Sequence, residues 1–338
     1  MRIVFDAKRY FHNSRGLGNY SRDVVRLIRE YAPNWEVVLM DKSGLSRSFM
    51  NIPPCDIYHG LSGELPFTIG RSQARSVVTM HDAIFIRYPE LYSPTYRWLF
   101  TQKVRFACKA ADTIIAISEQ TKRDMIEFFH ADESKIRVVY QGCSNIFRQP
   151  VSAEQIAEVK KKYDLPENYL LDVGAIEPRK NLKKLIQAMA AAKIDLPLVA
   201  IGGHSKYADE AAALAQQSGV TLLLRHGVTF ADFPSIYKGA EVLCYPSIFE
   251  GFGIPILEAM CVGTPVLTST GSCFAETGGE AALYANPLDI EEIGAQLNRI
   301  LTNNHLRQEM VAKGAVQANR FTDEQVAKNL IRVLQEPK

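Results

Sequence analysis

The segment EGFGIPILEAMCVGTPV, which begins at Glu250, holds the residues with the clearest chemical potential. Gly251 and Gly253 leave the backbone bare, and the proline and glycine that follow predict a helix over about 255–262. The free amides and positive dipole end of such a helix suit a phosphate or sugar hydroxyls. Glu250 and Glu258 flank this anion site, and because carboxylates repel phosphate, both should accept hydrogen bonds from hydroxyl groups.

A basic pair, Arg179 and Lys180, lies in a second informative segment, LLDVGAIEPRKNLKKLIQAM. An apolar strand runs into a loop that contains Gly174, and Asn181 is expected to cap the next helix. A fork-shaped guanidinium beside a point ammonium suits a diphosphate leaving group, whose charge grows as a bond to it breaks. Alone, a basic pair at a helix start is more often solvated; its occurrence in the same chain as the glutamate pattern favours the functional interpretation.

The first half offers weaker signals. GLGNYS, with Gly16 and Gly18, is an incomplete dinucleotide fingerprint, because Ser21 stands where a third glycine is required. The two glycines would let a helix start approach donor phosphates, and an ordinary turn is the alternative. His81 and Asp82 follow the apolar run RSVVTM, where a neutral imidazole could bond a sugar hydroxyl, although packing is the usual role of a lone histidine.

Four further polar residues are candidate contacts for a second substrate. Three flank the glycine loop and one should cap the helix after DTIIAI, although solvated loop positions would look the same; they are His12, Arg15, Asn19 and Ser118.

Apolar, branched runs bounded by Gly, Asp or Ser predict parallel strands buried on both faces, with helices between them. They are RIVFD, WEVVLM, CDIYHG, RSVVTMHD, DTIIAIS and KIRVVYQG, then NYLLDVG, LPLVAIGG, VTLLLRHG, AEVLCYP, TPVLTS and AALYANP. We therefore expect an α/β protein with two Rossmann-like doubly wound domains, 1–160 and 161–321, facing a central cleft. Residues 322–338 should form a closing helix, capped by Thr322, that packs back on the first domain.

Composition limits the class of protein. The 338 residues are 47% hydrophobic and 22% charged with a net charge of +2, a globular balance. Basic residues are in excess before Leu165 and acidic residues after it. The six cysteines form no CxxC pair and the histidines no HExxH spacing, so we expect free thiols, no metal and no other cofactor. Nothing indicates nucleic-acid binding, a secretory leader or a membrane span, and a cytoplasmic location is expected.

The pair of glutamates separated by seven residues around a GFG turn resembles the signature of family 4 glycosyltransferases with the two-domain GT-B fold. PRKN and HDAIFIRYPELY are similar to other loops of that family. The resemblance implies that Glu250 holds the donor sugar, Glu258 the ribose, and the backbone at Phe252 to Ile254 the sugar and diphosphate. Arg179, Lys180 and His81 would then act in catalysis, with Gly16, Gly18 and Gly174 beside the donor.

Such an enzyme would move a hexose from a nucleotide-diphosphate sugar, GDP-mannose or a UDP-hexose, to a glycan or lipid-linked acceptor in surface polysaccharide synthesis. The resemblance implies retention of anomeric configuration without metal, as in bacterial mannosyltransferases. Alternatives are an epimerase of the same fold, a non-catalytic sugar-nucleotide sensor and, through GLGNYS, a dehydrogenase.

The stretch SPTYRWLFTQKVRFACKAAD mixes aromatic and basic side chains. Trp98, Phe100 and Phe106 alternate there with Arg97, Lys103, Arg105 and Lys109. This composition suits a peripheral helix on anionic lipid and, equally, a core-facing helix with a basic outer side.

Overall fold

The computed structural model describes residues 1–13, 16–41 and 47–337, which form two compact units. The first unit comprises Met1–Gln141 with Thr322–Lys338, and the second comprises Gly142–Phe321. The second unit thus begins earlier in the chain than the expected boundary at 160, because the short helix Asn145–Arg148 and helix α7, Ala153–Lys162, pack within it.

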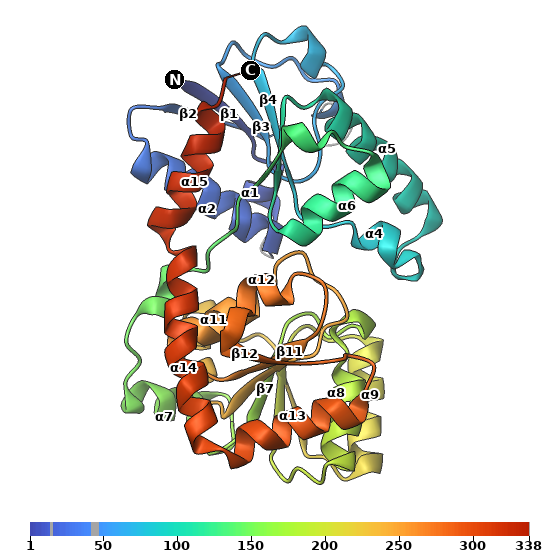
Figure 1. The fold of residues 1–338 in the computed structure, drawn as a ribbon, viewed down its shortest axis with the longest axis vertical. Helices are drawn as coiled ribbons and strands as arrows, with labels where there is room; N and C mark the ends of the chain where they lie inside the picture. Colours follow the sequence, from blue (N-terminus) through green and yellow to red (C-terminus); the bar gives the residue numbers. More distant parts are fainter. Residues whose placement is uncertain (14–15, 42–46, 338) are drawn as a thin grey trace. The chain divides into compact units, whose positions relative to one another are not determined.

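The first unit is built on a sheet of six parallel strands in the order β2-β1-β3-β4-β5-β6. Helices α2 and α15 lie on one face of this sheet, and α5 and α6 lie on the other (Figure 1). The strands are β1 (Arg2–Asp6), β2 (Glu36–Met40), β3 (Ile57–Gly60), β4 (Arg75–Met80), β5 (Thr113–Ala116) and β6 (Ile136–Val138). The helices are α1 (Lys8–His12), α2 (Gly16–Tyr31), α4 (Ile84–Arg87), α5 (Pro94–Ala110), α6 (Glu119–Phe129) and α15 (Asp323–Gln335).

The second unit repeats this architecture with the strand order β12-β11-β10-β7-β8-β9, also parallel throughout. Helices α8, α9 and α13 pack together in one layer, and α10, α11 and α14 in another (Figure 1). The strands are β7 (Leu170–Val173), β8 (Leu198–Ile201), β9 (Leu222–Arg225), β10 (Val242–Tyr245), β11 (Val266–Ser269) and β12 (Ala282–Ala285). The helices after α7 are α8 (Leu182–Ala191), α9 (Lys206–Ser218), α10 (Phe233–Lys238), α11 (Ile254–Val262), α12 (Phe274–Gly278), α13 (Ile290–Thr302) and α14 (Asn304–Ala318).

Each predicted apolar run forms a strand, and most of these strands are fully buried because helices cover both faces of each parallel sheet. The predicted cap at Thr322 is confirmed, since its hydroxyl accepts from the amide of Gln325 and starts α15. Within the first unit, α15 packs on α2. Of the helices that the structure describes, none is both long and apolar enough to cross a bilayer.

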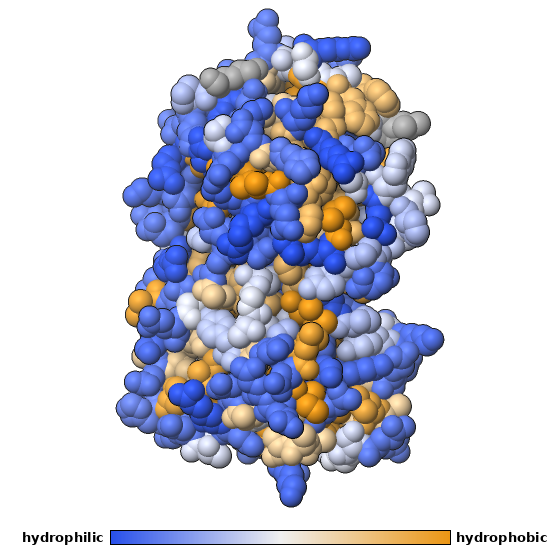
Figure 2. Space-filling model, turned by 45° about the vertical axis from the view of Figure 1, so that its right-hand side comes forward, coloured by the Kyte–Doolittle hydropathy of each residue, from blue (hydrophilic) through white to orange (hydrophobic). Residues whose placement is uncertain are grey.

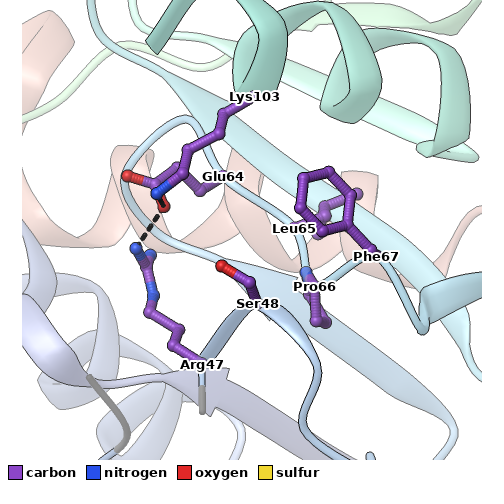
Figure 3. Close-up of a pocket in the computed structure, with 7 residues that line it drawn as sticks. All are labelled: Arg47, Ser48, Glu64, Leu65, Pro66, Phe67 and Lys103. Carbon is purple, nitrogen blue, oxygen red and sulfur yellow. Dashed lines mark hydrogen bonds and ion pairs between the residues drawn. The ribbon is translucent and has the colours of Figure 1, made fainter. Parts of the chain in front are cut away.

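A buried ionic cluster fixes the carboxyl edge of the first sheet. Arg47 pairs with Asp6, at the end of β1, over 2.6 Å and with Glu64, in the loop after β3. The Lys103 Nζ, on α5, lies 3.2 Å from the same Glu64 carboxylate, which therefore pairs with two cations (Figure 3). The Arg47 side chain is only 7% exposed, and a buried charge without a partner of opposite sign is strongly unfavourable, so each ion of the cluster stabilises the others.

Replacement of Arg47 by alanine should destabilise the first unit, because it leaves Asp6 buried without its partner. We expect a loss of about 3 kcal/mol, seen as a fall of roughly 6–12 °C in the midpoint of thermal unfolding. Arg2→Ala is the matched control, since Arg2 pairs with Glu36 at the surface and should cost less than about 1 kcal/mol. Equal losses in the two variants would contradict a structural role for the cluster.

Candidate functional site

Three charged side chains meet at the carboxyl edge of the second sheet. The Glu250 oxygen Oε1 lies 2.7 Å from Arg179 Nη1 and 2.6 Å from Lys180 Nζ. Their side chains are only 11–12% exposed. Burial would raise the pKa of Glu250, but the charges of Lys180 and Arg179 outweigh it and hold that pKa below its ordinary value. The carboxylate is therefore ionised and binds both predicted cations.

The loop after β7 positions Lys180 against an aromatic ring. Gly174 has φ +145°, a backbone conformation that favours glycine, and a Cβ there would lie 3.5 Å from Lys180 Nζ. The ammonium lies 4.6 Å from the centre of the Tyr245 ring and donates to the Tyr245 hydroxyl at 2.5 Å. Tyr245 ends β10, so two neighbouring strands define the position of this cation.

Asn181 is the N-cap residue of α8, as expected, but its side chain forms no capping hydrogen bond to the helix, so the prediction of a side-chain cap was wrong. The residue has the left-handed φ of 68°, and its amide instead donates to the carbonyls of Pro246 and Pro287. The backbone carbonyl of Arg179 also accepts from the amide of Ile248 at 2.8 Å. These bonds tie the loop that carries the cations to the loop after β10.

The turn that carries Glu250 leads directly into α11, which begins at Ile254, one residue before the predicted start. Gly253 is the N-cap residue with φ +88°, and no side chain caps the helix there. The first amides of α11 can therefore bind an anion or a hydroxyl. Gly251 is partly exposed, whereas the Phe252 ring is buried and packs on Phe321 with ring centres 5.4 Å apart.

Sequence reasoning missed the residues that support this turn. Ser272 bonds both the amide and the carbonyl of Glu250, at 3.1 and 2.9 Å. Cys273 donates to the same carbonyl, and Thr277 donates to the carbonyl of Phe252. These partners lie more than twenty residues further along the chain, so no short motif could have identified them.

Glu258 lies one turn inside α11 and accepts a hydrogen bond of 2.6 Å from the Tyr237 hydroxyl of α10. Burial raises the pKa of Glu258 to about 7, against a smaller opposing effect of this hydrogen bond. The second glutamate of the pattern is thus poised between its neutral and ionised forms near neutral pH, unlike Glu250.

This difference predicts how stability depends on pH. Because the folded pKa of Glu258 is higher than the unfolded one, the folded state binds the proton more tightly, and stability falls as pH rises from about 4.5 to about 7. Glu258→Gln removes this loss, so the wild type should lose on the order of 2–3 kcal/mol relative to the variant between about pH 5 and 8. Urea unfolding at both pH values measures it, with exposed Glu309→Gln as the charge-removal control. A constant difference between wild type and Glu258→Gln would contradict the raised pKa.

The two glycines of the first unit have separate roles. Gly16 begins α2 and has open space where a Cβ would be. Gly18 lies inside the helix, where a Cβ would fall 1.7 Å from the carbonyl oxygen of Asn13. Only glycine permits this close approach between α2 and the segment that follows α1. Gly18 is therefore required by packing, while Gly16 leaves space at the helix start.

His81 follows β4 as predicted, and its Nε2 lies 2.9 Å from the carbonyl oxygen of Leu61. Burial lowers the pKa of His81 to about 4, so the imidazole is neutral at physiological pH. Because a carbonyl can only accept, Nε2 carries the proton and Nδ1 is left as an acceptor. Asp82, next to it, accepts from the amide of Ile84 at 3.0 Å.

The candidates for a second substrate differ in what the structure leaves accessible. His12 is exposed and pairs with Asp41 at 2.9 Å, and Asn19 is exposed and accepts from Arg22. Ser118 is fully buried and caps α6 through the amide of Thr121, so its hydroxyl is engaged in structure. Arg15 lies outside the described residues.

Over residues 1–13, 16–41 and 47–337, no three His, Cys, Asp or Glu side chains come together where they could hold a metal ion. The described cysteines are free thiols.

Two six-stranded parallel sheets, each flanked by helices, define an α/β protein of two Rossmann-like units. Comparison with known families agrees. The model for glycosyl transferases group 1 matches residues 153–317, and the model for glycosyltransferase family 4 matches residues 11–144. The chain belongs to this glycosyltransferase family.

Two of the curated relatives are mannosyltransferases of Escherichia coli. O-antigen chain mannosyltransferase B of Escherichia coli is 31% identical over 279 residues, which cover 79% of this chain and 70% of that protein. The serotype-specific mannosyltransferase WbdA of Escherichia coli is 29% identical over 73% of this chain. The match spans only 32% of WbdA, which is a much longer protein.

Solved structures share the fold over nearly the whole chain. Sucrose-phosphate synthase from Thermosynechococcus elongatus superimposes with a TM-score of 0.80 at 18% identity, covering 99% of this chain and 98% of that one. Anabaena Alr3699/HepE, solved in complex with UDP-glucose, gives a TM-score of 0.76 at 18% identity, with 99% of both chains covered. At these identities the similarity establishes the GT-B fold.

Proposed function

We propose that the chain transfers a mannosyl residue from a nucleotide-diphosphate mannose, GDP-mannose being the favoured donor, to a glycan or lipid-linked acceptor in surface polysaccharide synthesis. The buried contact of Glu250 with Arg179 and Lys180 beside the start of α11 carries this proposal. The names of the mannosyltransferase relatives support the sugar, and the UDP-glucose complex of a structure with the same fold supports the class of donor.

Binding of the donor would replace Glu250 by the diphosphate as the partner of Arg179 and Lys180. A diphosphate competes with Glu250 for the two cations, because it also accepts charge-assisted hydrogen bonds and brings more negative charge. The released Glu250 carboxylate would then accept from the hydroxyls of the donor sugar, and Glu258 from those of the ribose. The first amides of α11 would complete the diphosphate site.

Catalysis would be electrostatic and would retain the anomeric configuration. Arg179, Lys180 and the helix amides stabilise the diphosphate as the glycosidic bond breaks, and the leaving phosphate takes the proton of the acceptor hydroxyl. Two fixed cations supply the charge that a divalent metal supplies elsewhere, so turnover should persist in EDTA. Proton NMR of the first product formed would report the anomeric configuration.

Lys180→Ala should lower kcat for transfer about a hundredfold or more, because it removes a cation from the developing diphosphate charge. Glu250→Ala should have a similar effect through the loss of sugar positioning. The readout is release of nucleotide diphosphate with a mannosyl acceptor, and unfolding curves confirm that each variant is folded.

Lys183→Ala is the matched control, because Lys183 lies on α8 and pairs with Glu210 at the surface. Near-normal turnover by both site variants would reject the assignment. Donor incubated alone distinguishes the alternatives, since an epimerase would change the sugar without an acceptor and a sensor would release no nucleotide diphosphate.

We further propose that the outer face of α5 contacts anionic lipid at the membrane. Trp98 is 66% and Leu99 49% exposed, and Arg105 and Lys109 point outward on the same helix. Three other aromatic or basic residues of the helix face the unit: Phe100 and Phe106 pack against its core, and Lys103 pairs with Glu64. Figure 2 shows apolar side chains reaching the surface between hydrophilic ones on one face of the molecule. Exposed aromatic and basic side chains together suit an anionic bilayer surface.

Sedimentation with vesicles tests this surface. Binding should occur with phosphatidylglycerol vesicles, weaken in high salt and be lost in Trp98→Ser/Leu99→Ser, because apolar insertion and charge attraction act together. Leu288→Ser is the matched control, since Leu288 is 64% exposed in the second unit. Binding that is equal for all three proteins, or absent for all, would reject this surface.

A further inference from the structure

Two cysteines that lie far apart in the sequence meet within the second unit. Cys143 stands in the loop just before the short helix Asn145–Arg148, and Cys261 lies in the last turn of α11. Their sulfur atoms are 3.5 Å apart, which is hydrogen-bonding distance for two thiols. Because 118 positions separate them along the chain, no CxxC spacing could have indicated this pair.

The two thiols differ in how readily they lose a proton. Cys143 is only 5% exposed, whereas Cys261 is partly exposed, so a negative charge is less unfavourable on Cys261. The hydrogen bond from the Cys143 thiol lowers the pKa of Cys261. Burial opposes this shift, the positive charge of Arg148 reinforces it, and the carboxylate of Glu258 opposes it. Cys261 is therefore the thiol that an oxidant would meet first.

The surrounding structure lets one sulfur move to the other. A disulfide joins its sulfurs at about 2 Å, so the two must approach by about 1.5 Å. Helix α11 packs on α10, α12 and α14, which hold Cys261 in place. Residues 141–144 form no helix or strand, and the short helix that follows them packs on α11. Arg148 anchors that helix by donating to the carbonyls of Ala318 and Phe321. The loop can thus carry Cys143 to Cys261 while its downstream end stays fixed.

We propose that Cys143 and Cys261 form a reversible disulfide when the protein meets hydrogen peroxide, and that this bond locks the second unit against unfolding. The Cys261 thiolate attacks one peroxide oxygen, the O–O bond breaks, and the released hydroxide leaves as water with the proton that Cys261 had lost. Cys143 then attacks the sulfur of the resulting sulfenic acid. The S–S bond forms as the S–O bond breaks, and a second water leaves with the proton of Cys143. Both sulfurs are oxidised, and one peroxide is reduced to two waters.

The locking effect follows from the length of chain that the bond encloses. The loop between Cys143 and Cys261 contains β7, β8, β9 and β10, and it ends in α11. Joining its ends restricts the unfolded chain much more than the folded one, and this restriction grows with the length of the loop. The disulfide therefore stabilises the second unit as a whole, and it does so whatever reaction the protein catalyses.

Peptide mapping by mass spectrometry tests the bond in the full chain. After mild treatment with hydrogen peroxide, the peptides of Cys143 and Cys261 should be linked, and dithiothreitol should release them. Cys143→Ser should stop at a sulfenic acid on Cys261, which dimedone traps. Cys55→Ser is the matched control, since Cys55 is a partly buried thiol of the first unit, and this variant should form the bond as the wild type does. Linkage of a different pair, or two unreacted thiols at 143 and 261, overturns the proposal.

Thermal unfolding of the same samples tests the lock. The oxidised wild type and oxidised Cys55→Ser should unfold about 4–10 °C above their reduced forms, because the closed loop restricts the unfolded chain. Cys261→Ser and Cys143→Ser should each unfold at the same temperature before and after peroxide, and comparison within one variant removes any effect of the substitution itself. A linked pair without a rise in the midpoint, or a rise that persists in Cys261→Ser, overturns the lock.

Discussion

The contact of one buried carboxylate with two cations is the interaction on which the carboxyl edge of the second sheet depends. Lys180 and Arg179 would repel each other and lose hydration in a site that is about nine-tenths buried. Glu250 contacts both cations through a single oxygen, and Glu177 also pairs with Arg179 at 2.6 Å, so two carboxylates offset these costs. Hydrogen bonds to the loop after β10 and to Ser272 then fix the backbone on either side of this carboxylate. The three charged groups are thus held in position by one another before any ligand binds.

Backbone conformation limits which residues can stand around this cluster. Gly174 at φ +145° and Gly253 at φ +88° adopt backbone conformations that other residues rarely adopt, and they open space for Lys180 and for the start of α11. Gly18 serves the first unit differently, through contact with a carbonyl rather than through its φ. These three glycines therefore meet different structural requirements, and Gly174 and Gly253 lie beside the charged cluster.

The sequence predicted the elements well because parallel strands covered on both faces must be apolar throughout, and helix ends need particular residues. The contact between Glu250 and the two cations was not predicted, since it joins loops some seventy residues apart and depends on which strands are neighbours. The hydrogen bonds of Ser272 and Thr277 to the turn that carries Glu250 were not predicted for the same reason. The Asn181 cap failed because tertiary carbonyls competed for its amide. Local rules thus located the loops, while long-range geometry determined their partners.

The two units differ in the kind of recognition that their sheet edges offer. The second unit presents fixed charge and helix amides, which suit an anion such as a diphosphate. The first unit presents a neutral histidine, stacked aromatic rings and a buried Arg9 Nε that has no hydrogen-bond partner among the described residues. Under the proposed function, the charged edge of the second sheet would hold the donor diphosphate, and the neutral groups at the edge of the first sheet would contact sugar hydroxyls.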